Sequence, residues 1–100
     1  MKEYRFGASS FRNELWIRQK AVFGKPDGVD VEFLSAGAFD WIVADPNGKP
    51  IKTVRNDNQH GDWASIHLPS LGLYNKYSIG FRKANDTPVM KIKQGVVSYA

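Results

Sequence analysis

The chain has 100 residues and a mass of 11.3 kDa, the size of one domain, so we expect a single domain over residues 1–100. Hydrophobic residues make up 42% and charged residues 24%, which excludes a disordered tail and predicts a folded, soluble chain. No apolar run approaches the roughly 20 residues of a membrane span. The absence of cysteine excludes disulfides, thiolate metal sites and cysteine nucleophiles, but it does not define the compartment.

The net charge of +4 originates in the second half of the chain, which contains seven Lys and Arg residues and only three acidic residues. One interpretation is a basic surface for an anionic partner. The other is that these lysines keep sheet edges soluble and discourage pairing between molecules. The candidate residues for an anionic partner are Lys76, Arg82, Lys91 and Lys93.

Apolar and polar residues alternate with a period of two along most of the chain, which predicts β-strands. The segment 10–23 also fits the start of a helix, but it lacks a helical apolar stripe, so we predict a strand there. The last strand changes phase near Gly95, which indicates a β-bulge. The predicted strands cover residues 3–6, 10–23, 29–33, 38–44, 50–55, 63–68, 74–83 and 89–99.

Turn residues separate these strands, most clearly at Lys25–Gly28, at Asp45–Gly48 and at residues 84–88. About eight strands at this spacing predict an all-β fold: an antiparallel β-sandwich of seven to eight strands, with Greek-key or jelly-roll connections. The predicted core consists of the residues of inward parity: Leu15, Ile17, Val31, Phe33, Phe39, Trp41, Val43, Ile66, Leu68, Tyr77, Ile79, Phe81, Met90 and Ile92.

Two segments carry a family resemblance. The run Leu71 to Tyr77, which leads into an alternating strand, resembles the tyrosine corner of immunoglobulin-like and fibronectin-III-like sandwiches, in which the tyrosine hydroxyl bonds to backbone upstream. The strand and turn from Trp41 to Gly48 resemble those of bacterial extracellular accessory β-sandwich modules. The resemblance implies a sandwich fold with a non-catalytic accessory role, and it implies no site residues.

Catalytic motifs are missing from the sequence, so we expect no enzyme and no cofactor. A catalytic alternative would need His60, Asp62 and His67 to converge on one pocket. The same three side chains could hold a metal, and Asn56, Asp57, Asn58 and Asp62 could supply oxygen ligands to calcium. Solvated loop and turn residues explain both patterns better, so we expect no metal site.

The tryptophans are more informative than the titratable residues. In the predicted alternation, Trp41 lies on the same face of its strand as core residues, whereas Trp16 and Trp63 lie on the outer faces of theirs. An exposed indole ring can stack on a sugar, a base or a protein partner, although either ring could instead cover an open end of the sandwich. Trp16 lies beside Arg18 and Lys20, a combination suited to an anionic polymer.

Trp63 lies in a polar setting that suits glycan recognition, because nearby side chains can bond to sugar hydroxyls. With Trp63 and Trp16, the candidate ligand-binding residues are Asn58, His60, Asp62 and His67.

These observations favour a non-catalytic module that binds a carbohydrate or an anionic surface polymer outside a bacterial cell. The alternative is a structural or protein-interaction module, for example a homo-oligomer that pairs through a sheet edge. The modest charge and the absence of RNA-binding motifs disfavour nucleic acid. We expect a secreted or cell-surface location, with a cytoplasmic one left open.

Overall fold

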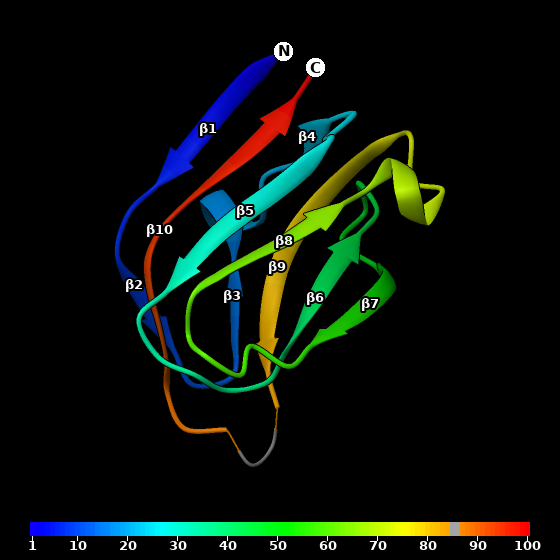
Figure 1. Ribbon diagram of the computed structural model, residues 1–100. Coiled ribbons are helices and arrows are strands. Elements are labelled where there is room, and N and C mark those ends of the chain that lie inside the picture. Colours follow the sequence, from blue (N-terminus) through cyan, green and yellow to red (C-terminus); the bar gives the residue numbers. More distant parts are fainter. Residues whose placement is uncertain (85–86) are drawn as a thin grey trace.

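The structure is a computed structural model that describes residues 1–84 and 87–100. Two antiparallel β-sheets of five strands each pack face to face (Figure 1). Two short 3-10 segments, η1 (Ile17–Lys20) and η2 (Pro69–Leu71), interrupt the strands. The strands are β1 (Lys2–Phe6), β2 (Ser9–Phe11), β3 (Glu14–Trp16), β4 (Phe23–Gly24), β5 (Gly28–Phe33), β6 (Phe39–Ala44), β7 (Pro50–Asn56), β8 (Trp63–His67), β9 (Lys76–Lys83) and β10 (Met90–Tyr99).

The strand order is that of a jelly roll. One sheet, here called sheet A, has the order β1-β10-β5-β8, with β2 also on β10; the other, sheet B, has the order β3-β9-β6-β7, with β4 also on β9. β1 and β2 both pair with β10 and together occupy one strand position of sheet A, and β3 and β4 both pair with β9 and together occupy one position of sheet B. The ten strands therefore fill the eight positions of a jelly roll, which consists of two Greek keys. The predicted β-sandwich is confirmed, and its connections are of the jelly-roll kind.

This order differs from that of an immunoglobulin domain, in which the last two strands belong to the same sheet. Here β9 lies in sheet B and β10 in sheet A. Locally, the expected contact of a tyrosine corner is present: Tyr77 is buried, and its hydroxyl accepts a hydrogen bond of 3.2 Å from the backbone N–H of Asn75. The resemblance therefore holds for the two-sheet antiparallel architecture, and the strand order is different.

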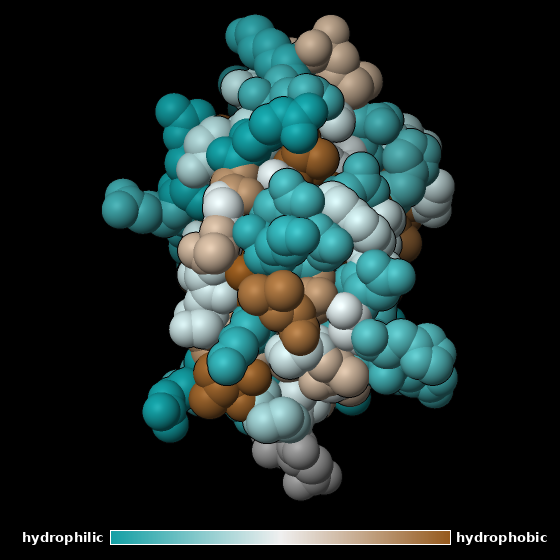
Figure 2. All heavy atoms as spheres, turned by 60° about the vertical axis from the view of Figure 1, so that its left-hand side comes forward, coloured by the Kyte–Doolittle hydropathy of each residue, from teal (hydrophilic) through white to brown (hydrophobic). Residues whose placement is uncertain are grey.

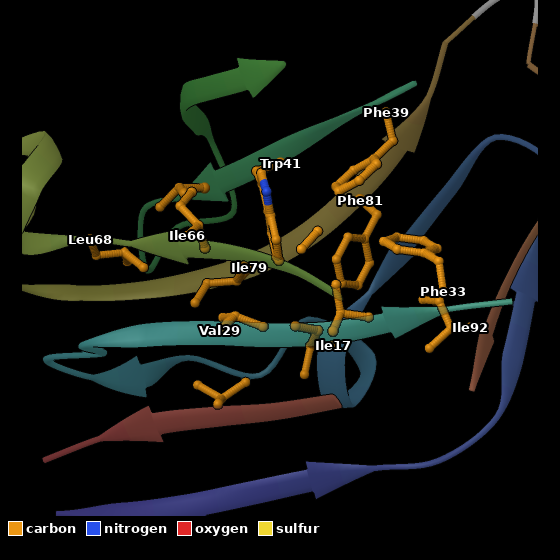
Figure 3. Packing of buried hydrophobic residues seen from close by; sticks show 14 of the residues in the cluster. Ile17, Val29, Phe33, Phe39, Trp41, Ile66, Leu68, Ile79, Phe81 and Ile92 are labelled. Atoms are coloured by element: carbon orange, nitrogen blue, oxygen red, sulfur yellow. The ribbon is translucent and has the colours of Figure 1, made fainter. Parts of the chain in front are cut away.

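Inward-facing side chains from both sheets form one core (Figure 3). Aromatic rings lie at its centre: the ring centroids of Phe33 and Phe39 are 4.8 Å apart, and those of Trp41 and Phe81 are 5.0 Å apart. Every predicted core residue is buried except Leu15, which is partly buried against the cluster. The alternation thus identified these core residues correctly, although Ile42 and Ala44, which have the opposite parity in β6, are also buried.

The single strand predicted over residues 10–23 is wrong. The segment forms the short strands β2, β3 and β4, and η1 lies between the last two. Arg18, Gln19 and Lys20 all have left-handed backbone angles, with φ of 51°, 55° and 65°. Neither a strand nor a right-handed helix accommodates such a run, so Ile17 enters the core from a turn and not from a strand.

The predicted irregularity in the last strand is confirmed, slightly earlier than expected. The register of β10 against β5 shifts between Ile92 and Gln94, so that Val97 faces the core and is fully buried. At Asp45–Gly48 the predicted turn is also present, where the Asp45 carboxylate accepts hydrogen bonds from the backbone N–H groups of Asn47 and Lys49. Both features follow from local sequence.

The surface on the β1 and β10 side is mainly hydrophilic (Figure 2). Hydrophobic residues appear there as separate patches among polar and neutral ones. Over the part of the chain that the structure describes, no helix is long and apolar enough to cross a membrane.

Candidate functional site

A polar depression lies at the loop between β7 and β8. Figure 1 shows this loop toward the end of the sandwich away from the two termini. The depression has a volume of about 580 Å³ and is lined by residues 55–60, Asp62 and Trp63. The loop between β7 and β8 provides most of this lining, so the depression spans the passage from sheet B to sheet A. Four of the six predicted ligand-binding residues meet here: Asn58, His60, Asp62 and Trp63.

The loop is held in place by the connection between β5 and β6. Asn58, with φ of 44°, donates a side-chain hydrogen bond of 3.1 Å to the Ser35 carbonyl and accepts one at its own carbonyl from the Gly37 N–H. Gly61 packs so closely that an added Cβ would lie 2.7 Å from the Ala36 nitrogen. The side-chain amide of Asn58 therefore fixes the loop and has less capacity for a ligand than the sequence suggested.

Trp63 stands at the rim of the depression as the first residue of β8. Its neighbours Ala64 and Ile66 face the core, so Trp63 faces outward, and it is 51% exposed. The predicted parity of this strand is confirmed. Directly opposite Trp63 in the register lies Glu32 on β5, so the ring borders both the depression and the outer face of sheet A.

The charged side chains of the depression are unequally paired. The Arg55 Nε donates a hydrogen bond of 2.6 Å to an Asp40 carboxylate oxygen. This bond and the negative charge of Asp40 raise the pKa of Arg55, and the charge of Asp57 raises it further. Within the described residues, the carboxylates of Asp57 and Asp62 have neither a hydrogen bond nor an ion pair. The depression thus contains the carboxylates of Asp57 and Asp62, which are free to accept hydrogen bonds, and Arg55, whose charge is balanced by Asp40.

The two histidines do not converge. His60 is exposed and lines the depression. At the far end of β8, His67 has Nδ1 2.5 Å from the Ser70 hydroxyl and Nε2 3.3 Å from an Asp27 carboxylate oxygen. The pocket of His60, Asp62 and His67 that a catalytic interpretation needs is therefore absent, and residues 1–84 and 87–100 contain no group of three or more His, Cys, Asp or Glu placed to hold a metal ion.

Trp16 lies outside the depression, on the outer face of sheet B. Its indole ring covers Gly80, where an added Cβ would lie 2.8 Å from the ring, and the Lys20 ammonium lies 4.3 Å from the ring centroid. The indole N–H donates to Glu14 over 3.3 Å. Trp16 faces outward as predicted, but it is partly buried and its ring has a packing role.

The four predicted basic residues do not share one face. Lys91 and Lys93 lie on sheet A, whereas Lys76 and Arg82 lie on sheet B. Arg82 bonds to Glu14 over 3.3 Å, and the Lys93 ammonium is 4.0 Å from Glu32. The structure therefore does not bring these residues together as a surface for an anionic partner.

Sequence reasoning did not place Arg55 and Gln59 among the binding residues, although both line the depression. For Gln59 a signal existed, because it lies between Asn58 and His60 in the same polar loop. Nothing in the sequence indicated Arg55, because its placement depends on the register of β7 against β6, which pairs it with Asp40.

The fold and the depression together define a class of protein: a jelly-roll β-sandwich with an exposed tryptophan and, at one end, the polar depression, called the hollow below. No protein-family model and no curated protein sequence matches the chain.

Proposed function

We propose that this domain is a non-catalytic module that binds a carbohydrate, with the sugar stacked on Trp63. The observation that carries the proposal is that Trp63, 51% exposed, lines the hollow together with the unpaired carboxylates of Asp57 and Asp62. The apolar face of a sugar packs on such a ring, while polar groups fix its hydroxyls. The domain would act at a secreted or cell-surface location, where polysaccharides are accessible.

The hollow favours a carbohydrate over an anionic polymer. Among the described residues that line it, the cation Arg55 is already paired with Asp40, and Asp57 and Asp62 would repel added negative charge. The basic residues that an anionic polymer would need lie on two different sheets.

The test is titration of the domain with short oligosaccharides of different sugars, measured by calorimetry, for the wild type and for Trp63→Ala. A lost stacking platform costs about 1–3 kcal/mol, so we expect the affinity to fall more than tenfold. Because Trp63 is exposed, the unfolding midpoint should change little.

Tyr74→Ala is the matched control, since Tyr74 is 63% exposed and lines a different pocket. Affinity should be unchanged in this variant. Equal affinity of wild type and Trp63→Ala for every bound sugar would refute the proposed site.

A further inference from the structure

Acidic side chains in the described part of the chain nearly all have a partner. Four form ion pairs, Glu3 with Arg5, Glu14 with Arg82, Glu32 with Lys93 and Asp40 with Arg55, and the Asp27 carboxylate lies 3.3 Å from the His67 Nε2. Two more accept hydrogen bonds, Asp30 from Ser65 and Asp45 from the backbone of its own turn. The two that remain, Asp57 and Asp62, both line the hollow beside Trp63.

Neither carboxylate is neutralised by Arg55. The Nε of Arg55 is taken by Asp40, whose side chain is only 19% exposed. Asp57 contributes the smallest of the effects that raise the pKa of Arg55, and it forms no ion pair with it. Among the described residues, Asp57 and Asp62 therefore have no ion-pair partner, in a chain whose net charge is +4.

An exposed indole ring and free carboxylates attract the same chemical group. A cation within about 6 Å of a tryptophan ring is held by the π-electrons, and an ammonium donates charge-assisted hydrogen bonds to carboxylates. Resting on the proposed function, we infer that the hollow selects an amino sugar whose amine is free and protonated. The ammonium lies against Trp63 and is bonded by Asp57 and Asp62.

The overall positive charge of the domain does not oppose this selection. At physiological ionic strength, exposed charges are largely screened beyond about 8 Å. Lys76 and Lys91 do not line the hollow, and the Lys93 ammonium is 4.0 Å from Glu32, which lies opposite Trp63. We therefore expect a ligand in the hollow to respond mainly to the charges that line it.

Two oligosaccharides with one backbone isolate the effect of the amine: tetramers of β-1,4-linked glucosamine and of β-1,4-linked N-acetylglucosamine. We expect the wild type to bind the amino form at least tenfold more tightly at low salt, with the difference shrinking as salt is added. In the double variant Asp57→Asn, Asp62→Asn the two affinities should become equal. The control Glu3→Gln removes one negative charge far from the hollow and should keep the preference.

The outcomes separate this inference from the proposed function. Equal affinity of the wild type for both tetramers, with loss of binding in Trp63→Ala, would overturn the amino-sugar selection and support the carbohydrate site. A preference that survives in the double variant, or that falls equally in Glu3→Gln, would also overturn it. Binding of both tetramers that is unaffected by Trp63→Ala would overturn the proposed function.

Discussion

Single residues explain how two strand pairs pack so closely. In sheet B, Gly80 lies opposite Trp16, and in sheet A, Gly95 lies opposite Phe6, with the aromatic ring lying over the glycine in each pair. A Cβ on Gly80 would also lie 2.8 Å from the Leu15 carbonyl oxygen, which is backbone and cannot rotate away. The space next to the backbone at position 80 therefore accommodates only glycine.

Gly80→Ala should destabilise the domain by about 1–3 kcal/mol, the usual effect of overpacking. For a domain of this size, each kcal/mol lowers the unfolding midpoint by roughly 4–8 °C, which calorimetry measures easily. Gly7→Ala is the control, because an added Cβ there meets no atom within 4 Å. An equal effect of both substitutions would show that close packing at Gly80 is not the cause.

The histidines provide a second prediction at this scale. His60→Ala should weaken glycan binding by about 0.5–1.5 kcal/mol, the value of one hydrogen bond, whereas His67→Ala should leave affinity unchanged because His67 is engaged with Asp27 and Ser70. Calorimetric titration of both variants measures the two effects. Reduced affinity in His67→Ala alone would contradict the assignment of the site.

Some site residues could be predicted from the sequence and others could not. Parity along one strand is local information, and it was sufficient to place Trp63 outward. The pairing of Arg55 with Asp40 depends on the register between β7 and β6, which no local pattern encodes. For the same reason, the separation of Lys91 from Arg82 onto different sheets was not foreseen.

At the scale of elements, η1 is where the sequence pattern failed. Alternation from Leu15 to Phe23 fits a strand, but long-range contacts hold a left-handed turn there: Arg18 lies 5.2 Å from the Tyr4 ring centroid, and Lys20 donates to the Gly48 carbonyl over 3.1 Å. Left-handed backbone costs about 1–2 kcal/mol per L-residue. Tertiary contacts offset this cost, and a single sequence does not reveal them.

Gln19→Gly should stabilise the domain by up to about 1 kcal/mol, because glycine adopts φ near 55° without strain and loses only part of that gain to chain flexibility. Urea unfolding measures the change as a higher midpoint. Gln19→Ala keeps the strain and should show no such gain. A lower midpoint for Gln19→Gly would show that the turn is unstrained.

At the scale of the whole molecule, the sheet edges bear on the alternative function, a module that pairs through an exposed strand. The edge strand β7 begins with Pro50 and exposes Lys52 and Thr53 along its length. Proline and lysine on an edge oppose pairing with another chain.

We therefore expect a monomer of 11.3 kDa in sedimentation equilibrium at micromolar concentration. A stable dimer that Lys52→Thr strengthens would instead support the interaction module. Pro50→Thr tests the effect of the proline separately from that of Lys52, since it restores a backbone N–H donor without changing the charge of the edge.

The pairing of β1 with β10 governs how fast the domain can fold. Lys2 lies opposite Tyr99, so the first strand finds its partner only after nearly the whole chain is available. β9 and β10, which each lie at an inner position of their sheet, are also the last strands in sequence. Closing such long loops makes all-β domains fold in milliseconds to seconds, far more slowly than helical bundles. During synthesis, the apolar side of β1, with Tyr4 and Phe6, must therefore stay exposed until the last strand has emerged.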